Sequence, residues 1–403
     1  MVMLVILIMG ASAMLLNALN STTPQLARAR VTADALIKAK EALIGYAITY
    51  GDTHTNVSGF LPCPDQGQNN TEDGEANNSC SDSDINISAI GKLPWKTLRI
   101  SPIKDGNGEC FWYAVSGTYK NKIETDLMNW DNNGLFKIMA PDGVSFIAGS
   151  SAVNQPVAVI FSPGPALGTQ SRNSVTKAPS CGGNYTSSNY LDNDTIHNIN
   201  NASISATANT VTQFISGQVK DLLGNEIVND RLLFITRDEI FNAIKKRNDF
   251  ESFLTSSLIG RAVTCLNLAT LPDPISINFD TMGELPGATQ GMGMNQHITG
   301  RIKESSCTDN SVRKWRDNLA YTKCSSGMQC LTINSASCRG AIIFTGQQST
   351  SQSRISNIQK NDWNNYLEGG ALNIFTSTTT SISGASATYT PTAPSTDLVA
   401  CIP

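Results

Sequence analysis

Oxygen-bearing side chains crowd the segment between Cys63 and Cys80. Oxygen ligands at short spacing suit Ca²⁺, so this segment is a candidate calcium site. It departs from an EF-hand loop because Gly67 stands where a ligand is needed and Asn70 where the turn glycine belongs. A solvated acidic loop is the alternative interpretation. The candidate ligands are Asp65, Asn69, Glu72, Asp73 and Glu75.

A second group of possible calcium ligands comprises Asp105, Asn107 and Glu109. Their D-x-N-x-E spacing offers three oxygen ligands on one short loop. The sequence DGNG around them is also typical of a tight turn, so a purely structural turn is the competing interpretation. Ca²⁺ is the one cofactor that either cluster suggests.

Nothing in the sequence points to catalysis. The chain has no G-x-S-x-G nucleophile motif, and Lys92 is not preceded by the glycines of a phosphate-binding loop. The three histidines, His54, His197 and His297, stand in polar segments, and we interpret them as solvated loop residues. We therefore expect a protein that is not an enzyme.

The ten cysteines indicate an oxidising environment. Their even number permits five disulfides, and no pair has the C-x-x-C spacing of a zinc site, so we expect no transition metal. Spacing favours Cys63 with Cys80, and Cys324 with either Cys330 or Cys338. Cys401 is expected to hold the Ser/Thr-rich C-terminal tail. The remaining candidates are Cys110, Cys181, Cys265 and Cys307.

The overall charge argues against nucleic-acid binding. The formal net charge is −4, and the sequence contains no basic stripe of the kind that contacts phosphates. We expect no nucleic-acid partner.

The chain starts with an apolar segment. Residues 1–16 are uncharged, and the first charged residue is Arg28. At 1.5 Å per residue, sixteen to twenty helical residues span about 24 to 30 Å, close to the thickness of a bilayer core. The segment lacks the basic start and small-residue cleavage site of a secretory signal, so we expect it to be retained.

Helical periodicity continues beyond this segment. Pro24 is expected to break or kink the helix, because proline lacks an N–H and crowds the preceding turn. Leu36, Ala39, Leu43 and Ala47 then fall on one face. The sequence thus predicts a helix of about fifty residues whose second half packs on a globular domain.

This arrangement resembles type IV pilins and the pseudopilins of type II secretion. The remainder of the chain is similar to a group of large bacterial pilin-like proteins through five strings: ALIKAKEALIGYA (35–47), LPCPD (61–65), GKLPWKTL (91–98), DGNGECFWYAVS (105–116) and NDRLLFIT (229–236).

The resemblance implies a structural subunit of an extracellular filament on a bacterial surface. Copies of the chain would associate through their N-terminal helices, with small residues allowing close approach. Before assembly the same helix would anchor the chain in the inner membrane, and a pilus or secretion machinery would build the fibre. The residues expected in the filament core are Met1, Leu4, Val5, Ile8, Gly10, Ala11, Ala13 and Leu15.

One residue departs from the pilin pattern. Pilins usually carry Glu at the fifth mature position, whereas position five here is Val5. If Met1 is the first mature residue, this favours a tip or minor pseudopilin as one alternative. A membrane-tethered adhesin is another, suggested by the long loops rich in Asn, Ser and Thr.

Landmarks of the first half recur in the second in the same order. LIGYA, VAVIF, Ser171–Arg172 and NYLD are followed by LIGRA, AIIF, Ser353–Arg354 and NYLE. A T-x-x-E capping box at Thr236 predicts a second helix over 236–263. We therefore expect an α+β protein with an internal duplication: an apolar helix over 1–27, a first lobe over 28–235 and a second over 236–403. Each disulfide-stapled lobe would lay a helix on an antiparallel sheet.

Overall fold

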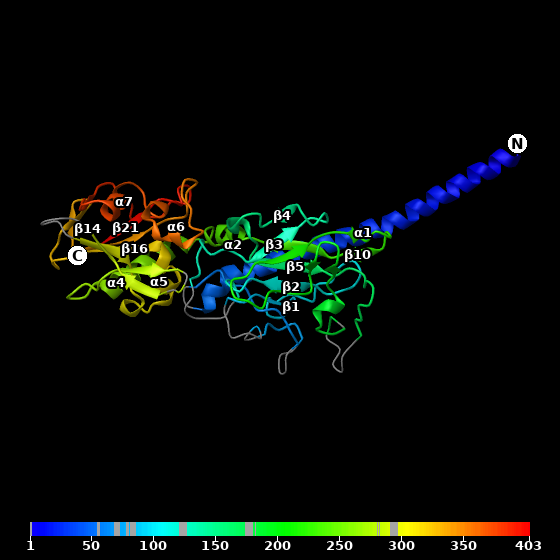
Figure 1. Ribbon diagram of the computed structural model, residues 1–403, viewed down its shortest axis with the longest axis horizontal. Helices are drawn as coiled ribbons and strands as arrows, with labels where there is room; N and C mark the ends of the chain where they lie inside the picture. The colour runs from blue at the N-terminus through cyan, green and yellow to red at the C-terminus, as the bar shows by residue number, and fades with distance from the viewer. Residues whose placement is uncertain are drawn as a thin grey trace. The chain divides into compact units, whose positions relative to one another are not determined.

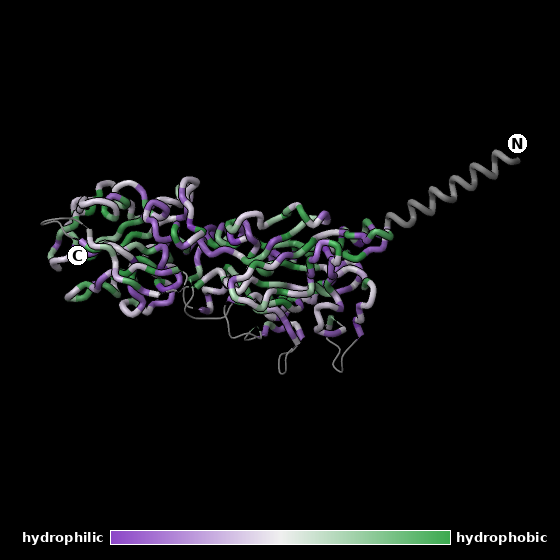
Figure 2. Tube along the Cα trace, viewed as in Figure 1, coloured by the Kyte–Doolittle hydropathy of each residue, from purple (hydrophilic) through white to green (hydrophobic). Residues whose placement is uncertain are grey.

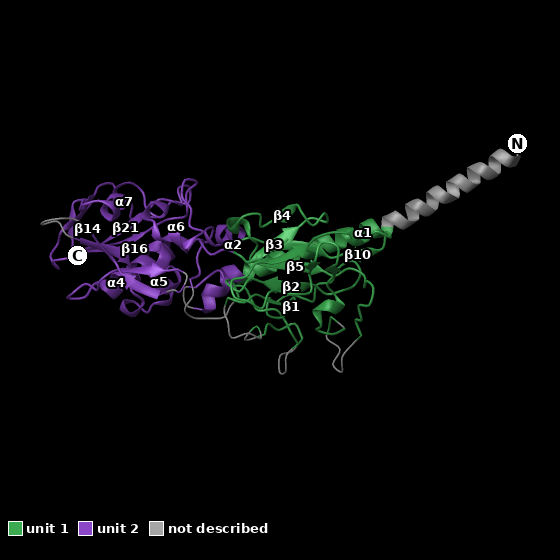
Figure 3. Ribbon diagram, viewed as in Figure 1, with its two compact units in different colours: residues 1–46, 61–122, 134–236 green, residues 47–60, 123–133, 237–403 purple. Residues whose placement is uncertain are grey.

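The computed structural model describes residues 2–54, 57–67, 73–77, 80, 86–120, 127–173, 180–181, 183–279, 281, 283–290 and 297–403, with side chains from residue 24 on except at 290. Two compact units make up the chain (Figure 3). Unit 1 comprises Met1–Tyr46, Leu61–Lys122 and Gly134–Thr236. Unit 2 comprises Ala47–Phe60, Ile123–Asn133 and Arg237–Pro403.

A single long helix, α1 (Val2–Thr53), begins the fold (Figure 1). Pro24 lies inside it and the helix continues beyond, so the proline costs one hydrogen bond without ending the helix as the predicted break implied. Leu36, Ala39 and Leu43 are buried as the spacing predicted. The charged residues of this stretch, among them Arg30, stay exposed on the other side. The described half of α1 is therefore one-sided.

Unit 1 is built around an antiparallel sheet in the order β1-β2-β5-β11. Its strands are β1 (Ala89–Lys92), β2 (Trp112–Val115), β5 (Ala158–Ser162) and β11 (Arg231–Ile235). Every residue of β2 and β5 is buried, because these runs of β-branched and aromatic residues suit a sheet covered on both faces. Figure 2 shows green, hydrophobic stretches of the chain in the region of this sheet.

Smaller elements complete unit 1. In the sheet β4-β3-β8, β3 pairs antiparallel with β4 and parallel with β8. Two hairpins pair β6 with β7 and β9 with β10. The bounds are β3 (Phe136–Met139), β4 (Phe146–Ala148), η1 (Ala152–Asn154), η2 (Ser187–Asn189), β6 (Asn193–Asp194), β7 (Ile199–Asn200), β8 (Thr212–Ile215), β9 (Val219–Lys220) and β10 (Glu226–Val228).

Unit 2 contains a seven-stranded antiparallel sheet in the order β13-β12-β15-β16-β19-β21, with β14 also paired to β15. A second sheet has the order β18-β17-β20. The strands are β12 (Ile275–Asn278), β13 (Gly283–Pro286), β14 (Ala288–Gln290), β15 (His297–Arg301), β16 (Leu319–Cys324), β17 (Leu331–Ile333), β18 (Ala336–Cys338), β19 (Gly340–Phe344), β20 (Ser381–Ile382) and β21 (Leu398–Ile402).

The helices of unit 2 are short. They are α2 (Arg237–Ile244), α3 (Phe250–Ser252), the π-helix η3 (Phe253–Gly260), α4 (Arg261–Leu266), η4 (Glu304–Ser306), α5 (Asn310–Lys314), η5 (Arg316–Asn318), α6 (Asn357–Asn361), η6 (Trp363–Asn365) and α7 (Gly369–Thr376).

The predicted helix over 236–263 is in fact interrupted. α2 ends at Ile244, and helical structure resumes at Phe250. The sequence KKRND between them ends in Asn and Asp, whose side chains compete with helical hydrogen bonding. Arg247 there turns its guanidinium toward the carboxylates of Asp52 and Asp249. The apolar residues of the predicted helix are buried on both sides of the interruption. They are Ile240, Phe250, Leu254 and Leu258.

The fold class is α+β, as expected. Both central sheets share one topology, because β15-β16-β19-β21 has the same order and antiparallel pairing as β1-β2-β5-β11. Each unit is made of three separate chain segments, however, whereas each expected lobe was a single continuous segment. Residues 47–60 and 123–133 belong to unit 2, where Trp130 is buried against Trp315 and Phe344.

Candidate functional site

The expected filament-core residues, from Met1 to Leu15, precede residue 24 and lie outside the described side chains. Over the described residues, no helix has both the length and the apolar character that crossing a membrane would demand. The open face of the described part of α1 carries charged and polar side chains together with the exposed Leu26, Val31 and Ile37.

The first calcium candidate is partly visible. Tyr185 donates to Asp65 Oδ2 and Asp73 Oδ1, each at 3.3 Å. Asp65 also accepts hydrogen bonds from the N–H of Gly67 and of Gly74. Burial raises the pKa of the Asp65 carboxyl. Its oxygens thus brace the loop between the paired Cys63 and Cys80.

The other residues of this cluster are less defined. Glu75 is half-buried, and Asn69 and Glu72 lie outside the described residues. Within the described ranges, no group of three or more His, Cys, Asp or Glu side chains is placed to hold a metal ion. Calcium binding here stays a prediction.

The second candidate is a structural turn packed against α1. Asp105 is buried, and its Oδ1 accepts from the N–H of Asn107 (2.8 Å) and of Glu109 (3.0 Å). Oδ2 accepts from Ser162 Oγ (2.8 Å) and Gly164 N–H (3.1 Å). Four protein donors therefore hydrogen-bond to the Asp105 side chain. They occupy the roughly four acceptor positions that the two oxygens of a carboxylate provide.

All ten cysteines are paired. The bond Cys63–Cys80 matches the prediction, Cys330 is the partner of Cys324, and Cys401 is held by Cys338. The two pairs that the sequence left open are Cys110–Cys181 and Cys265–Cys307. Each bond closes within one unit.

The expectation of solvated loop histidines is wrong for His297, whereas His54 is exposed in the turn after α1 and His197 is partly exposed in the turn between β6 and β7. His297 lies in β15, fully buried, and its Nε2 donates to the carbonyl of Ile374 at 2.7 Å. His197 contacts the carboxylate of the buried Asp194. His54 stacks on Tyr50 with ring centroids 3.9 Å apart. Polar neighbours in the sequence did not reveal these partners.

An arginine in unit 1 holds the loop that follows β5. Arg172 donates from Nε to the carbonyl of Asn189 (3.0 Å) and from Nη1 to that of Gly164 (2.7 Å). Its Nη2 donates to Gln170 Oε1 (2.9 Å), and the guanidinium lies 5.0 Å from the ring centre of Tyr190. We call this set of five residues the unit 1 arginine cradle.

Unit 2 contains an equivalent cradle after β19. Arg354 donates from Nε to the carbonyl of Asn365 (2.6 Å) and from Nη1 to that of Gly346 (3.2 Å). Its Nη2 donates to Gln352 Oε1 (3.3 Å), and the guanidinium lies 4.3 Å from the ring centre of Tyr366. The landmarks Ser171–Arg172 and Ser353–Arg354 therefore occupy equivalent structural positions.

The equivalence extends to a pair of acidic residues beside each cradle. The glutamine of the cradle donates to Asp192 (2.8 Å) in unit 1 and to Glu368 (3.0 Å) in unit 2. The N–H of that acidic residue then donates to Asp230 and to Asp397 respectively, both at 2.8 Å. Asp230 and Asp397 each directly precede the edge strand, β11 or β21.

The acidic partner of the cradle arginine differs between the units. Arg172 pairs with Glu109, which is partly exposed. Arg354 pairs with Asp131 at 2.9 Å, and both side chains are only 1 % exposed. The Arg354 guanidinium helps to lower the pKa of Asp131 against the opposing effect of burial. Sequence reasoning missed Asp131, because nothing local marks a partner 223 positions away.

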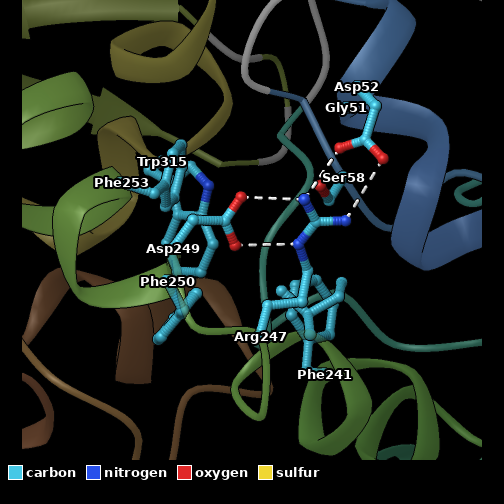
Figure 4. A pocket seen from close by; sticks show the side chains of 10 residues that line it. Gly51, Asp52, Ser58, Phe241, Arg247, Asp249, Phe250, Phe253 and Trp315 are labelled. Atoms are coloured by element: carbon cyan, nitrogen blue, oxygen red, sulfur yellow. Dashed lines mark hydrogen bonds and ion pairs between the residues drawn. The ribbon is translucent and has the colours of Figure 1, made fainter.

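A small cavity of about 260 Å³ in unit 2 is lined by four aromatic residues and an ion-pair cluster (Figure 4). Arg247 bridges Asp52, near the end of α1, and Asp249, each with a 2.8 Å contact. Arg247 lowers the pKa of Asp249. This cluster fastens the end of α1 within unit 2. The aromatic residues are Phe241, Phe250, Phe253 and Trp315.

A larger cleft, of about 570 Å³, lies in unit 1 beside the first described turns of α1. Arg28 and Thr32 line one side of it, and Gln218 and Glu226 of the β9–β10 hairpin line another. Thr32 Oγ1 accepts a hydrogen bond from Gly106 N–H (3.0 Å), which ties the 105–109 turn to the helix.

The chain matches no known family model, curated protein or solved structure. The function must therefore be inferred from the chain's own residues. Those described above hold helices, turns and strand ends together.

Proposed function

We propose that the protein is a pilin-like structural subunit. Residues 1 to about 27 pack helix against helix in an extracellular filament, and the two units are displayed outside it. The inner membrane holds the subunit before assembly. The proposed core residues are those named from the sequence, from Met1 to Leu15, with Gly10 and Ala11 at the point of closest approach.

The observation that carries this proposal is the division of α1 into two kinds of surface. Its described half buries one stripe, including Leu36, Ala39 and Leu43, and leaves charges on the other side. Its first sixteen residues are uncharged. A helix of this kind needs an apolar surrounding for its start and an aqueous one for its continuation, which a filament core or a bilayer supplies.

Two further observations support the proposal. Five disulfides suit an oxidising, extracytoplasmic location. The recurrence of sheet order, arginine cradle and acidic pair favours an internal duplication of one pilin-like globular unit.

The test compares the full chain with Gly10→Leu. Both are purified in mild detergent, transferred to detergent-free buffer, and examined by sedimentation and negative-stain microscopy. We expect filaments from the full chain and impaired assembly from Gly10→Leu, with membrane insertion retained in both. Normal filaments from Gly10→Leu would contradict the proposed close contact at Gly10. A full chain that never polymerises would contradict the filament role.

Val5 supports a second candidate, a tip or minor pseudopilin. A chain with no subunit above it has no need of the carboxylate that major pilins place near a neighbour's amino terminus. Immunogold labelling of native fibres distinguishes the two roles. Labels along the whole fibre favour the main proposal, labels at ends favour the tip subunit, and membrane-bound monomers favour a tethered adhesin.

A further inference from the structure

Two leucines at the tip of the β9–β10 hairpin stand out from the rest of the surface of unit 1. Leu222 and Leu223 are 102 % and 86 % exposed, more than the other large hydrophobic side chains found exposed in the described chain. Adjacent leucines held this far into water cost free energy, and an exposed apolar pair of this kind is typical of a contact surface.

The turn that carries these leucines is braced. Asp221 Oδ1 accepts hydrogen bonds from the N–H of Leu223 (2.9 Å) and of Asn225 (2.8 Å). Asn225 Nδ2 also donates to Asp221 Oδ2 (2.9 Å), and Gly224 takes the positive φ that the turn requires. The backbone therefore holds the leucines outward instead of letting them fold back onto the unit.

The hairpin lies beside the start of the described part of α1. Gln218 and Glu226 at its base line the same cleft as Gln25 and Arg28 of the helix, and Figure 1 shows β10 next to α1. At 1.5 Å per residue, twenty helical residues span the roughly 30 Å of a bilayer core. A core entered at Met1 therefore ends near residue 20, and Gln25 is about 8 Å beyond that point. The headgroup layer of a bilayer is about 5 to 8 Å thick on each side, so the hairpin is at the depth of the lipid headgroups when the apolar run spans the bilayer.

Basic side chains surround this position. Lys220 in the hairpin, Arg28 and Arg30 in α1, and Arg231 at the cleft are all exposed. The acidic groups facing the same region are Asp221, which is engaged in the turn, and Glu226, which accepts from Gln218 at 2.6 Å. Apolar tips flanked by basic residues favour the interface of an anionic bilayer.

We propose that the β9–β10 hairpin is a second membrane contact, in which Leu222 and Leu223 enter the headgroup region of an anionic bilayer beside α1. This inference rests on the proposed membrane-anchored stage of the subunit. The contact fixes the orientation of unit 1 over the membrane before assembly, because a helix alone leaves rotation about its own axis free.

The test uses the full chain in vesicles of phosphatidylcholine and phosphatidylglycerol that contain brominated acyl chains. Leu223→Trp reports the hairpin tip. Val144→Trp is the matched control, because Val144 is 75 % exposed in another hairpin turn of unit 1, braced by Asp142. Difference spectra against the parent chain isolate each new tryptophan. We expect a blue shift and bromine quenching at position 223 and neither at position 144.

Co-sedimentation with the vesicles separates the two proposals. A chain that sediments with vesicles while Leu223→Trp behaves like Val144→Trp overturns the hairpin contact and leaves the helix anchor standing. A chain that does not sediment overturns both. If Leu223→Trp is blue-shifted only in lipid-free filaments, the occupant is a neighbouring copy, and the lipid contact is wrong.

Discussion

Buried carboxyl groups beside the arginine cradles are the most distinctive polar residues of both units. Burial, with the nearby Asp192 carboxylate, raises the pKa of Asp230 well above its usual value. In unit 2, burial raises the pKa of Asp397 to about 8, and the charge of Glu368 adds to the shift. Burial therefore favours the protonated form of both carboxyl groups in the folded protein, although each directly precedes an edge strand in the sequence.

Asp397 should make unit 2 less stable as the pH rises. Between the ordinary value of 3.8 and about 8, the folded state keeps a proton that the unfolded chain has released. The free energy of unfolding therefore falls with pH, by about 1.4 kcal/mol per pH unit for this one group. Asp397→Asn removes the titration and keeps an acceptor for the Glu368 N–H, so urea unfolding at several pH values should show a flatter dependence.

Asp142→Asn is the control for this experiment. The pKa of Asp142 is lowered to about 2 by hydrogen bonds from Ser145 and Val144. Its contribution to stability is lost only as the pH falls toward that value, so the variant should keep the parent slope between pH 5 and 8. An unchanged slope in Asp397→Asn would show that this carboxyl is ionised in the folded protein.

At the scale of elements, the seating of α1 depends on close approach of backbones. Gly106 lies against the helix so closely that a Cβ there would be 2.2 Å from the carbonyl oxygen of Arg28 and 2.6 Å from its Cα. The Asp105 carboxylate accepts a backbone hydrogen bond within this turn, and Thr32 Oγ1 accepts one from the N–H of Gly106. The DGNG turn thus supports the helix, which explains why Asp105 is buried and Gly106 is partly buried.

Two alanine substitutions test this seating in opposite directions. Gly106→Ala should destabilise the protein by about 1 to 3 kcal/mol, because the backbone must shift to admit the methyl group. Gly45→Ala in α1 should stabilise it by up to about 1 kcal/mol, since a Cβ there meets nothing within 4 Å. Urea unfolding followed by circular dichroism measures both. Equal effects from the two variants would refute the close contact at Gly106.

At the scale of the whole molecule, each unit has its own cross-links. Unit 1 contains Cys63–Cys80 and Cys110–Cys181, and the other three disulfides lie in unit 2. The pair Cys338–Cys401 joins β18 to the C-terminal edge strand β21. The Ser/Thr-rich segment before β21 is thereby closed into a loop instead of forming a loose tail.

Removing a disulfide should cost more stability where the loop that it closes is longer, with a logarithmic dependence on loop length. Sequence separations of 63 for Cys338–Cys401 and 6 for Cys324–Cys330 correspond to about 4 and about 2 kcal/mol respectively in the chain-entropy model. Paired serine variants at each site, compared by denaturant unfolding, measure the difference. Peptide mapping without reduction checks the five bonds, and any pair linking the two units would contradict the fold.

Several features of this protein were already determined by local sequence. The stripe of Leu36, Ala39 and Leu43 follows helical periodicity, and the buried strands β2 and β5 are continuous apolar runs. The short pair Cys63–Cys80 followed from spacing. Repeated landmarks such as Ser171–Arg172 and Ser353–Arg354 pointed to equivalent positions. These features were predictable because they depend on neighbours within a few residues or on direct recurrence.

Only the tertiary structure decided which distant groups meet. Asp131 belongs to unit 2 because Trp130 packs in that core and Arg354 needs a buried counter-ion. Asp105 holds its turn against α1, and His297 is buried in a strand, although the sequence around His297 suggested a solvated loop. A buried polar group is satisfied by whichever partner the packing brings to it, and that choice is made across long separations that local patterns do not encode.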